Sequence, residues 1–117
     1  MMESLAMDGA RTDKRRFERV PVSVPTRLYF HEAEEPLASM TADLGLEGAR
    51  FCSERRLRAG APVLVRLQLG PDKPIIECKG KVCWAGDGDE EFTDFGVRFL
   101  DLRDDEREAL RRFLERS

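Results

Sequence analysis

Apolar residues that recur at every second position are the feature of this sequence that most restricts its fold. A period of two is typical of a half-buried β-strand, because successive side chains of a strand point to opposite faces of the sheet. Glycine- and proline-containing segments separate the stretches that show it. The pattern predicts strands at residues 20–30, 39–44, 49–53, 63–69, 76–84 and 95–99.

Two of the connections have recognisable turn chemistry. Gly45-Leu46-Glu47-Gly48 predicts the turn of a hairpin, in which glycine can take positive φ without a Cβ penalty. Residues 70–74, Gly-Pro-Asp-Lys-Pro, predict a second turn. Pro21 and Pro25 fall on one face of the first strand and lack an N–H group, which predicts an edge position or an irregular start for that strand.

After Asp101 the apolar residues follow the three-and-four spacing of an amphipathic α-helix, with Asp104 and Asp105 favourably placed near its N-terminus. Six short antiparallel strands and one terminal helix predict a mainly all-β fold. The expected architecture is a small barrel or a strongly curled sheet, with the helix covering its open end or face.

The 117 residues suffice for one modest core, so residues 14–117 are expected to form one domain after a flexible segment at residues 1–13. This first segment has no apolar stretch of signal-peptide length, and no part of the chain is apolar enough to insert into a membrane. Three cysteines without paired spacing fit a reducing compartment. We therefore expect a cytoplasmic domain.

The residue inventory argues against catalysis and metal binding. His31 is the only histidine, which excludes a histidine-based metal cluster and a Ser-His-Asp triad. The acidic stretch at residues 86–94 lacks the ligand pattern of an EF-hand loop, so we interpret it as a solvated hairpin loop. No nucleophile, metal or cofactor motif is present, and the chain is not expected to be an enzyme.

Charge is unevenly distributed. The net charge of −3 argues against a dedicated nucleic-acid binder, whose affinity depends on phosphate contacts. Residues 11–19 nevertheless hold five basic and two acidic residues, and Arg15, Arg16 and Arg19 lie just before the first predicted strand. Guanidinium groups bind phosphate oxygens in pairs and stack on purine faces, which suits a nucleotide. The alternative is a solvated basic tail.

The hairpin turn contains a second candidate, Asp43. An ionised aspartate only accepts hydrogen bonds, and the guanine edge offers two adjacent donors that one carboxylate can bind. Gly45 and Gly48 would allow the backbone to come close to a ligand. Taken alone, this segment is weak evidence for a binding site and is better explained as an ordinary tight turn, because Asp and Gly are common in such turns. Trp84, in phase with the inward side of its predicted strand, is either a core residue or a ligand contact.

Together these segments resemble the PilZ family. That family pairs an Arg-x-x-x-Arg element before its first strand with an Asp/Asn-x-Ser-x-x-Gly element between its second and third strands. Here they are residues 15–19, Arg-Arg-Phe-Glu-Arg, and residues 43–48, Asp-Leu-Gly-Leu-Glu-Gly. Trp84, residues 95–99 and the closing helix extend the resemblance from about Lys14 to the C-terminus. It implies a six-stranded antiparallel barrel that binds cyclic di-GMP and signals to a downstream protein, here unidentified.

The resemblance also implies roles for individual residues. Arg15 and Arg19 would hold phosphate and guanine, with Arg16 adding charge. Asp43 would bind a guanine edge, Gly48 would permit the turn, and Trp84 would flank the ligand. Gly45 stands where the family pattern has serine. The loss of one neutral hydroxyl removes about 0.5 to 1.5 kcal/mol, so weaker binding is expected. The alternative is a PilZ-like interaction module that has lost its ligand.

Overall fold

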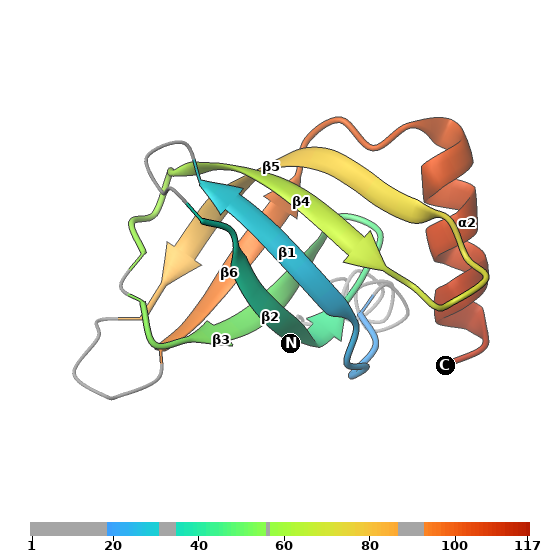
Figure 1. Ribbon diagram of the computed structural model, residues 1–117, viewed down its shortest axis with the longest axis horizontal. Coiled ribbons are helices and arrows are strands. Elements are labelled where there is room, and N and C mark those ends of the chain that lie inside the picture. The colour runs from blue at the N-terminus through green and yellow to red at the C-terminus, as the bar shows by residue number, and fades with distance from the viewer. Residues whose placement is uncertain (1–18, 31–34, 56, 87–92) are drawn as a thin grey trace, which may run out of the picture.

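The computed structural model describes residues 19–30, 35–55, 57–86 and 93–117. Within these ranges the chain forms six strands and one helix (Figure 1). They are β1 (Pro25–Phe30), β2 (Leu37–Leu44), β3 (Gly48–Ser53), β4 (Pro62–Gln68), β5 (Ile75–Ala85), β6 (Thr93–Phe99) and α2 (Asp104–Glu115). The segment predicted to be flexible, Arg15, Arg16, His31 and most of the acidic loop lie outside the described residues.

The strands close into a barrel with the order β1-β2-β3-β6-β5-β4 (Figure 1). Every neighbouring pair is antiparallel. The predicted six-stranded antiparallel barrel with a C-terminal helix is confirmed. Because the sheet closes on itself, none of the described strands leaves an unpaired edge to which another chain could add.

Alternating side chains fill the barrel as the sequence pattern predicts. Phe51 of β3 and Phe95 of β6 are cross-strand partners, and their rings stack with centroids 5.4 Å apart. Both are at most 1% exposed. Further core side chains come from β6, from the other strands and from α2: Leu28, Leu44, Val63, Val65, Leu67, Ile76, Val82, Val97, Phe99, Leu110 and Leu114.

The first strand begins later than predicted. The alternation indicated a strand from Val20, but β1 begins at Pro25, and residues 20–24 form only one isolated bridge. Thr41 of β2 holds this segment, because its hydroxyl accepts a hydrogen bond from Val24 N–H at 2.8 Å and donates one to the Val22 carbonyl at 2.5 Å. The prolines explain the late start, since a residue without N–H cannot complete a strand ladder.

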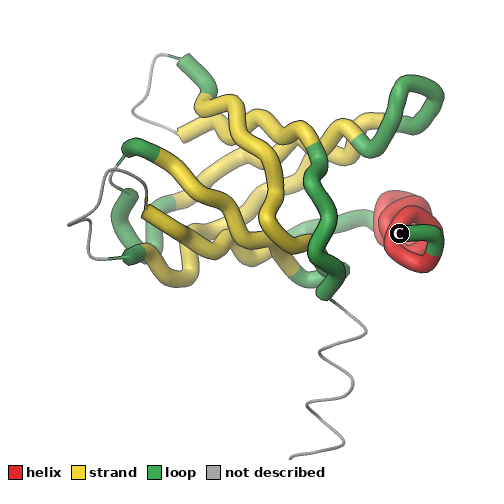
Figure 2. Tube along the Cα trace, turned by 90° about the horizontal axis from the view of Figure 1, so that it is seen from below, coloured by secondary structure: helices red, strands yellow, loops and turns green. Residues whose placement is uncertain are grey.

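The helix α2 lies across one end of the barrel, beside the turn that joins β4 to β5 (Figures 1 and 2). Leu110 and Leu114 extend the core at that end. Glu106 fixes the N-terminus of α2, because its carboxylate accepts hydrogen bonds from the Arg103 N–H at 3.2 Å and the Glu77 N–H of β5 at 3.3 Å. The predicted covering helix is thus tied to the strand that it covers.

Cys78 of β5 predicts a pH dependence of stability. Burial, with the nearby charges of Asp101 and Glu106, raises the pKa of this thiol from 9.0 to about 12. The unfolded chain releases the proton near pH 9 while the folded chain keeps it, so stability is unaffected below pH 9 and falls between pH 9 and 12. Denaturant unfolding should show wild type losing about 1 kcal/mol more than Cys78→Ala between pH 8 and 10. Equal losses would show that this thiol does not cause the effect.

Candidate functional site

The segment before β1 lies against the end of β2. Val20 and Leu44 exchange backbone hydrogen bonds, with N···O distances of 2.8 and 2.9 Å. This pairing brings Arg19 beside Asp43, with a guanidinium nitrogen 4.0 Å from Asp43 Oδ1. Two parts of the predicted site, separated by more than twenty residues in sequence, are therefore neighbours. Arg15 and Arg16 lie outside the described residues.

The two carboxylate oxygens of Asp43 have different surroundings. Oδ2 accepts a hydrogen bond from Arg50 Nε at 2.9 Å. Oδ1 is buried and has no hydrogen-bond partner in the described part of the chain. A buried acceptor without a partner is costly and uncommon in folded proteins. Oδ1 can therefore accept a hydrogen bond from a ligand without breaking one within the protein.

Arg50 is a site residue that the sequence analysis missed. Its guanidinium bridges Asp43 and Asp94, with a nitrogen 3.2 Å from Asp94 Oδ2. The hydrogen bond to Asp43 is the main cause that raises the pKa of Arg50. The signal was present in the sequence, because Asp43 and Arg50 flank the predicted hairpin turn and are cross-strand partners. Arg50 thereby orients the Asp43 carboxylate.

A hollow of about 460 Å³ opens beside this turn. Its lining includes three predicted site residues, Arg19, Gly45 and Gly48. Arg98 and Cys83, which the sequence analysis did not single out, also line it, as does Glu47. Two guanidinium groups against one carboxylate make the lining of the hollow favourable to an anion.

Gly48 is required for a different reason from the one predicted. Gly60 is the only described glycine with positive φ, so neither Gly45 nor Gly48 uses the positive φ that glycine allows. A Cβ on Gly48 would overlap the carbonyl oxygen of Val97. Glycine is needed here because β3 passes very close to β6. The turn itself is closed by a hydrogen bond from Gly45 N–H to the Gly48 carbonyl, at 2.9 Å.

Trp84 lies on the outer wall of the barrel. The register between β5 and β6 shifts between Val82 and Trp84, which breaks the alternation that placed Trp84 inside. Its side chain is 39% exposed, so its interpretation as a core residue is wrong. The indole lies against Gly96, where a Cβ would overlap it.

One row of cross-strand partners joins these features. Asp43, Arg50, Gly96 and Trp84 follow one another across β2, β3, β6 and β5. We call this surface, together with Arg19 and the adjoining hollow, the Asp43 wall. It combines a carboxylate, guanidinium groups and an exposed indole. Hydrogen bonding, phosphate binding and stacking are therefore possible on one surface.

Two findings bear on other classes of function. The described ranges contain no group of three or more histidine, cysteine, aspartate or glutamate side chains that could hold a metal ion. No helix within them is long and apolar enough to cross a membrane.

A comparison with family models gives a match to the PilZ domain over residues 13–116. The chain belongs to the PilZ domain family. PilZ domains commonly bind cyclic di-GMP, and they are regulatory binding modules rather than enzymes. No curated protein matched the chain significantly.

Solved structures share the PilZ fold with this chain. The Bacillus subtilis inhibitor of motility (MotI/DgrA) has a TM-score of 0.72 at 12% identity, over 85% of this chain and 48% of that one. The PilZ domain of CeSA from a cellulose-synthesizing bacterium has a TM-score of 0.60 at 18% identity, over 83% and 94%. A tetrameric PilZ protein of Xanthomonas campestris has a TM-score of 0.53 at 22% identity, over 74% and 50%. The chain thus spans about half the length of the motility inhibitor.

Proposed function

We propose that this PilZ domain binds cyclic di-GMP at the Asp43 wall and signals its presence to a partner protein. The approach of Arg19 to Asp43, 4.0 Å apart at the edge of the hollow, is the observation that carries the proposal. Within the family pattern, these residues belong to the two elements that bind the nucleotide. Their side chains meet on one surface, although Arg19 is the only residue of the first element that lies within the described ranges.

The chemistry of the wall suits this ligand. Arg19, joined by Arg15 and Arg16, supplies guanidinium groups for the two phosphates and the guanine faces. Asp43 Oδ1 accepts from the N1–H and the exocyclic amine of a guanine, while Arg50 holds the other oxygen. Trp84 offers an exposed aromatic surface beside them. Arg19 is half exposed and only loosely paired with Asp43, so it can turn to the ligand.

In this mechanism no covalent bond is made or broken. The arginine segment closes over the nucleotide, and its loss of conformational freedom reduces the net affinity. Since residues 20–24 are bonded to β2, closure changes the surface at the start of β1. We propose that a downstream protein in the cytoplasm recognises this change.

Calorimetric titration with cyclic di-GMP tests the arginines. Arg15→Ala and Arg19→Ala should each weaken binding at least about tenfold, because each removes charge-assisted hydrogen bonds worth about 1.5 to 3 kcal/mol. Arg107→Ala, an exposed arginine of α2 at the barrel end, is the matched control and should bind as wild type does. Equal heats and affinities in all four proteins would remove the arginines from the mechanism.

Gly45 favours a second candidate function, that of an interaction module that no longer binds the nucleotide. It lines the hollow at the position where the family pattern has serine. If the module has lost its ligand, cyclic di-GMP should give no heat with wild type or with Gly45→Ser. Binding by wild type excludes this candidate.

Gly45→Ser also yields a quantitative prediction for a protein that does bind. The added hydroxyl borders the hollow and can form one neutral hydrogen bond with the nucleotide. The affinity should rise by up to about tenfold, which corresponds to 0.5 to 1.5 kcal/mol. Gly45→Ala, which adds the Cβ without the hydroxyl, is the control. An equal gain in both variants would assign the effect to the backbone instead of the hydrogen bond.

A further inference from the structure

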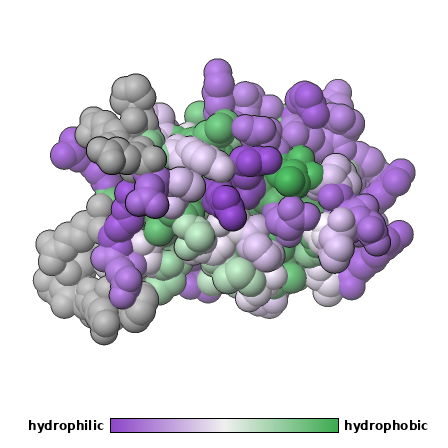
Figure 3. Space-filling model, viewed as in Figure 1, coloured by the Kyte–Doolittle hydropathy of each residue, from purple (hydrophilic) through white to green (hydrophobic). Residues whose placement is uncertain are grey.

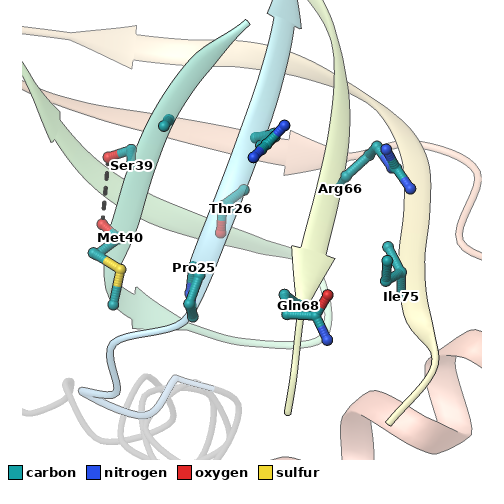
Figure 4. A pocket seen from close by; sticks show the side chains of 9 residues that line it. Pro25, Thr26, Ser39, Met40, Arg66, Gln68 and Ile75 are labelled. Carbon is teal, nitrogen blue, oxygen red and sulfur yellow. Dashed lines mark hydrogen bonds between the residues drawn. The ribbon is translucent and has the colours of Figure 1, made fainter. Parts of the chain in front are cut away.

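A second groove, of about 580 Å³, lies on the opposite wall of the barrel, across β2, β1, β4 and β5 (Figure 4). None of the predicted site residues lines it. The close-up shows Met40 of β2 on one side and Ile75 of β5 on the other, with Pro25 and Gln68 between them. We call this surface the β1–β4 groove.

One row of the groove is mainly apolar, with Gln68 as its polar member. Met40 is 50% exposed and Ile75 is 45% exposed, although both are large hydrophobic residues. Pro25 of β1 lies directly opposite Met40 and continues the row. On the face that β1 and β4 form, hydrophobic surface is visible between hydrophilic side chains (Figure 3). Apolar residues gathered in a groove, unlike scattered ones, are typical of a binding surface.

The neighbouring row is cationic. Arg27 of β1 and Arg66 of β4 are direct cross-strand partners, an arrangement in which like charges repel. The cross-strand partner of Arg27 on β2 is Ala38, whose small side chain leaves the Arg27 side of the row accessible. The pKa of Tyr29 is lowered, mainly by a hydrogen bond with Arg66 and also by the charges of Arg66 and Arg27.

No described acid lines the groove, although Glu77 flanks this row on β5: the pKa of Arg66 is raised mainly by a hydrogen bond with Tyr29 and to a smaller extent by the charge of Glu77. Neither Arg27 nor Arg66 forms an ion pair in the described ranges. Glu77 is the cross-strand partner of Arg66 on β5 but outside the groove lining. Arg66 Nε is buried and has no hydrogen-bond partner among the described residues. A buried donor of this kind favours an acceptor supplied from outside the chain.

We propose that the β1–β4 groove docks an extended segment of a partner protein in which acidic and apolar residues alternate. In an extended segment successive side chains point to opposite sides, so one set can enter the apolar row while the other meets the cationic row. Docking occurs through side chains, because the closed barrel offers no edge for strand addition. The docking does not depend on the nucleotide site.

The groove favours a protein segment over a lipid surface. Met40 and Ile75 line a hollow instead of projecting from a flat face, and Pro25 and Gln68 separate them (Figure 4). A chain with side chains at regular intervals can fill such a hollow, whereas a bilayer surface contacts protruding residues.

Fluorescence anisotropy with labelled, capped peptides tests the proposal. The probe is Glu-Leu-Glu-Leu-Glu, and the comparisons are Lys-Leu-Lys-Leu-Lys and Glu-Ser-Glu-Ser-Glu. The Glu-Leu peptide should bind wild type at least about tenfold more tightly than either, since each comparison removes one of the two complementary features. Similar affinity for the Lys-Leu peptide would overturn the proposal.

Substitutions in the groove test whether the Glu-Leu peptide binds there. Arg27→Glu and Arg66→Glu should each weaken binding of the Glu-Leu peptide about tenfold, and Ile75→Ser should weaken it by a smaller factor. Arg107→Glu makes the same charge change outside the groove and should leave binding unchanged, as should Arg19→Ala, which impairs only the proposed nucleotide site. Equal affinities for Arg27→Glu, Arg66→Glu and wild type would place the peptide elsewhere.

Two further measurements address other occupants. Sedimentation of wild type should show a monomer, and a dimer that Arg27→Glu dissociates would make a second copy the occupant. Vesicles of phosphatidylglycerol should not retain the protein, and retention that depends on Arg27, without peptide binding, would make a lipid surface the occupant. Either result would overturn the proposal.

Discussion

Asp43→Ala is expected to weaken cyclic di-GMP binding by roughly 100-fold. The substitution removes the acceptor for two guanine donors and leaves them facing a partly buried surface without partners. Charge-assisted hydrogen bonds are worth about 1.5 to 3 kcal/mol each, and unpaired donors add a cost of their own. The loss should therefore be about 2.7 kcal/mol, measured by calorimetric titration.

Asp94→Ala is the matched control for this prediction. Asp94 is a carboxylate that pairs with the same Arg50, at 3.2 Å, but it is half exposed and lies on β6, across Arg50 from Asp43. Its loss should change the affinity by no more than about threefold, because surface ion pairs contribute little. If the two variants bound equally well, Asp43 would be only a partner of Arg50 and not a ligand residue.

Phe51→Ala is expected to have the largest effect on stability. Phe51 is fully buried and stacks on Phe95 across the β3–β6 pair. Truncating a buried phenylalanine leaves a cavity and costs about 3 to 5 kcal/mol, a large share of the stability of a small domain. Urea unfolding at equilibrium should show this loss as a lower midpoint with an unchanged slope.

The neighbouring Cys52→Ala is the control, because Cys52 belongs to the same strand but points outward and is exposed. Its effect should stay within about 0.5 kcal/mol, as is usual for surface substitutions. A cost below about 1.5 kcal/mol for Phe51→Ala would contradict the assignment of the Phe51–Phe95 pair to the centre of the core.

Much of the barrel could be predicted from the sequence because strand periodicity is a local property. The alternating apolar positions of residues 63–69 are buried and the positions between them are partly exposed, and the three apolar residues of residues 95–99 that were predicted to point inward are buried. The start of β1 could not be found in this way, since the alternation continues through Val20 while the missing N–H groups of two prolines interrupt the ladder. The outward position of Trp84 depends on a register shift against β6, which is not a local property.

The sequence was enough to select individual residues of the site, but not the contacts that bring these residues together. Arg19 and Asp43 were selected for their chemistry, and the bridge between Val20 and Leu44 brings them together. Arg50 was missed because an arginine within an alternating strand has the pattern of any solvated position. The need for glycine at position 48 was predicted for its backbone angle, whereas the actual cause is contact with β6, which only the tertiary structure contains.

An amide-resolved NMR titration with cyclic di-GMP tests the central claim most directly, because it locates the ligand on the barrel. If the nucleotide binds at the Asp43 wall, the largest shifts should occur at Arg19, at residues 43–48, at Arg50 and around Trp84 and Gly96. The β1–β4 groove should change little. Shifts centred on Arg27, Arg66 and Ile75, with the Asp43 wall unaffected, would contradict this claim.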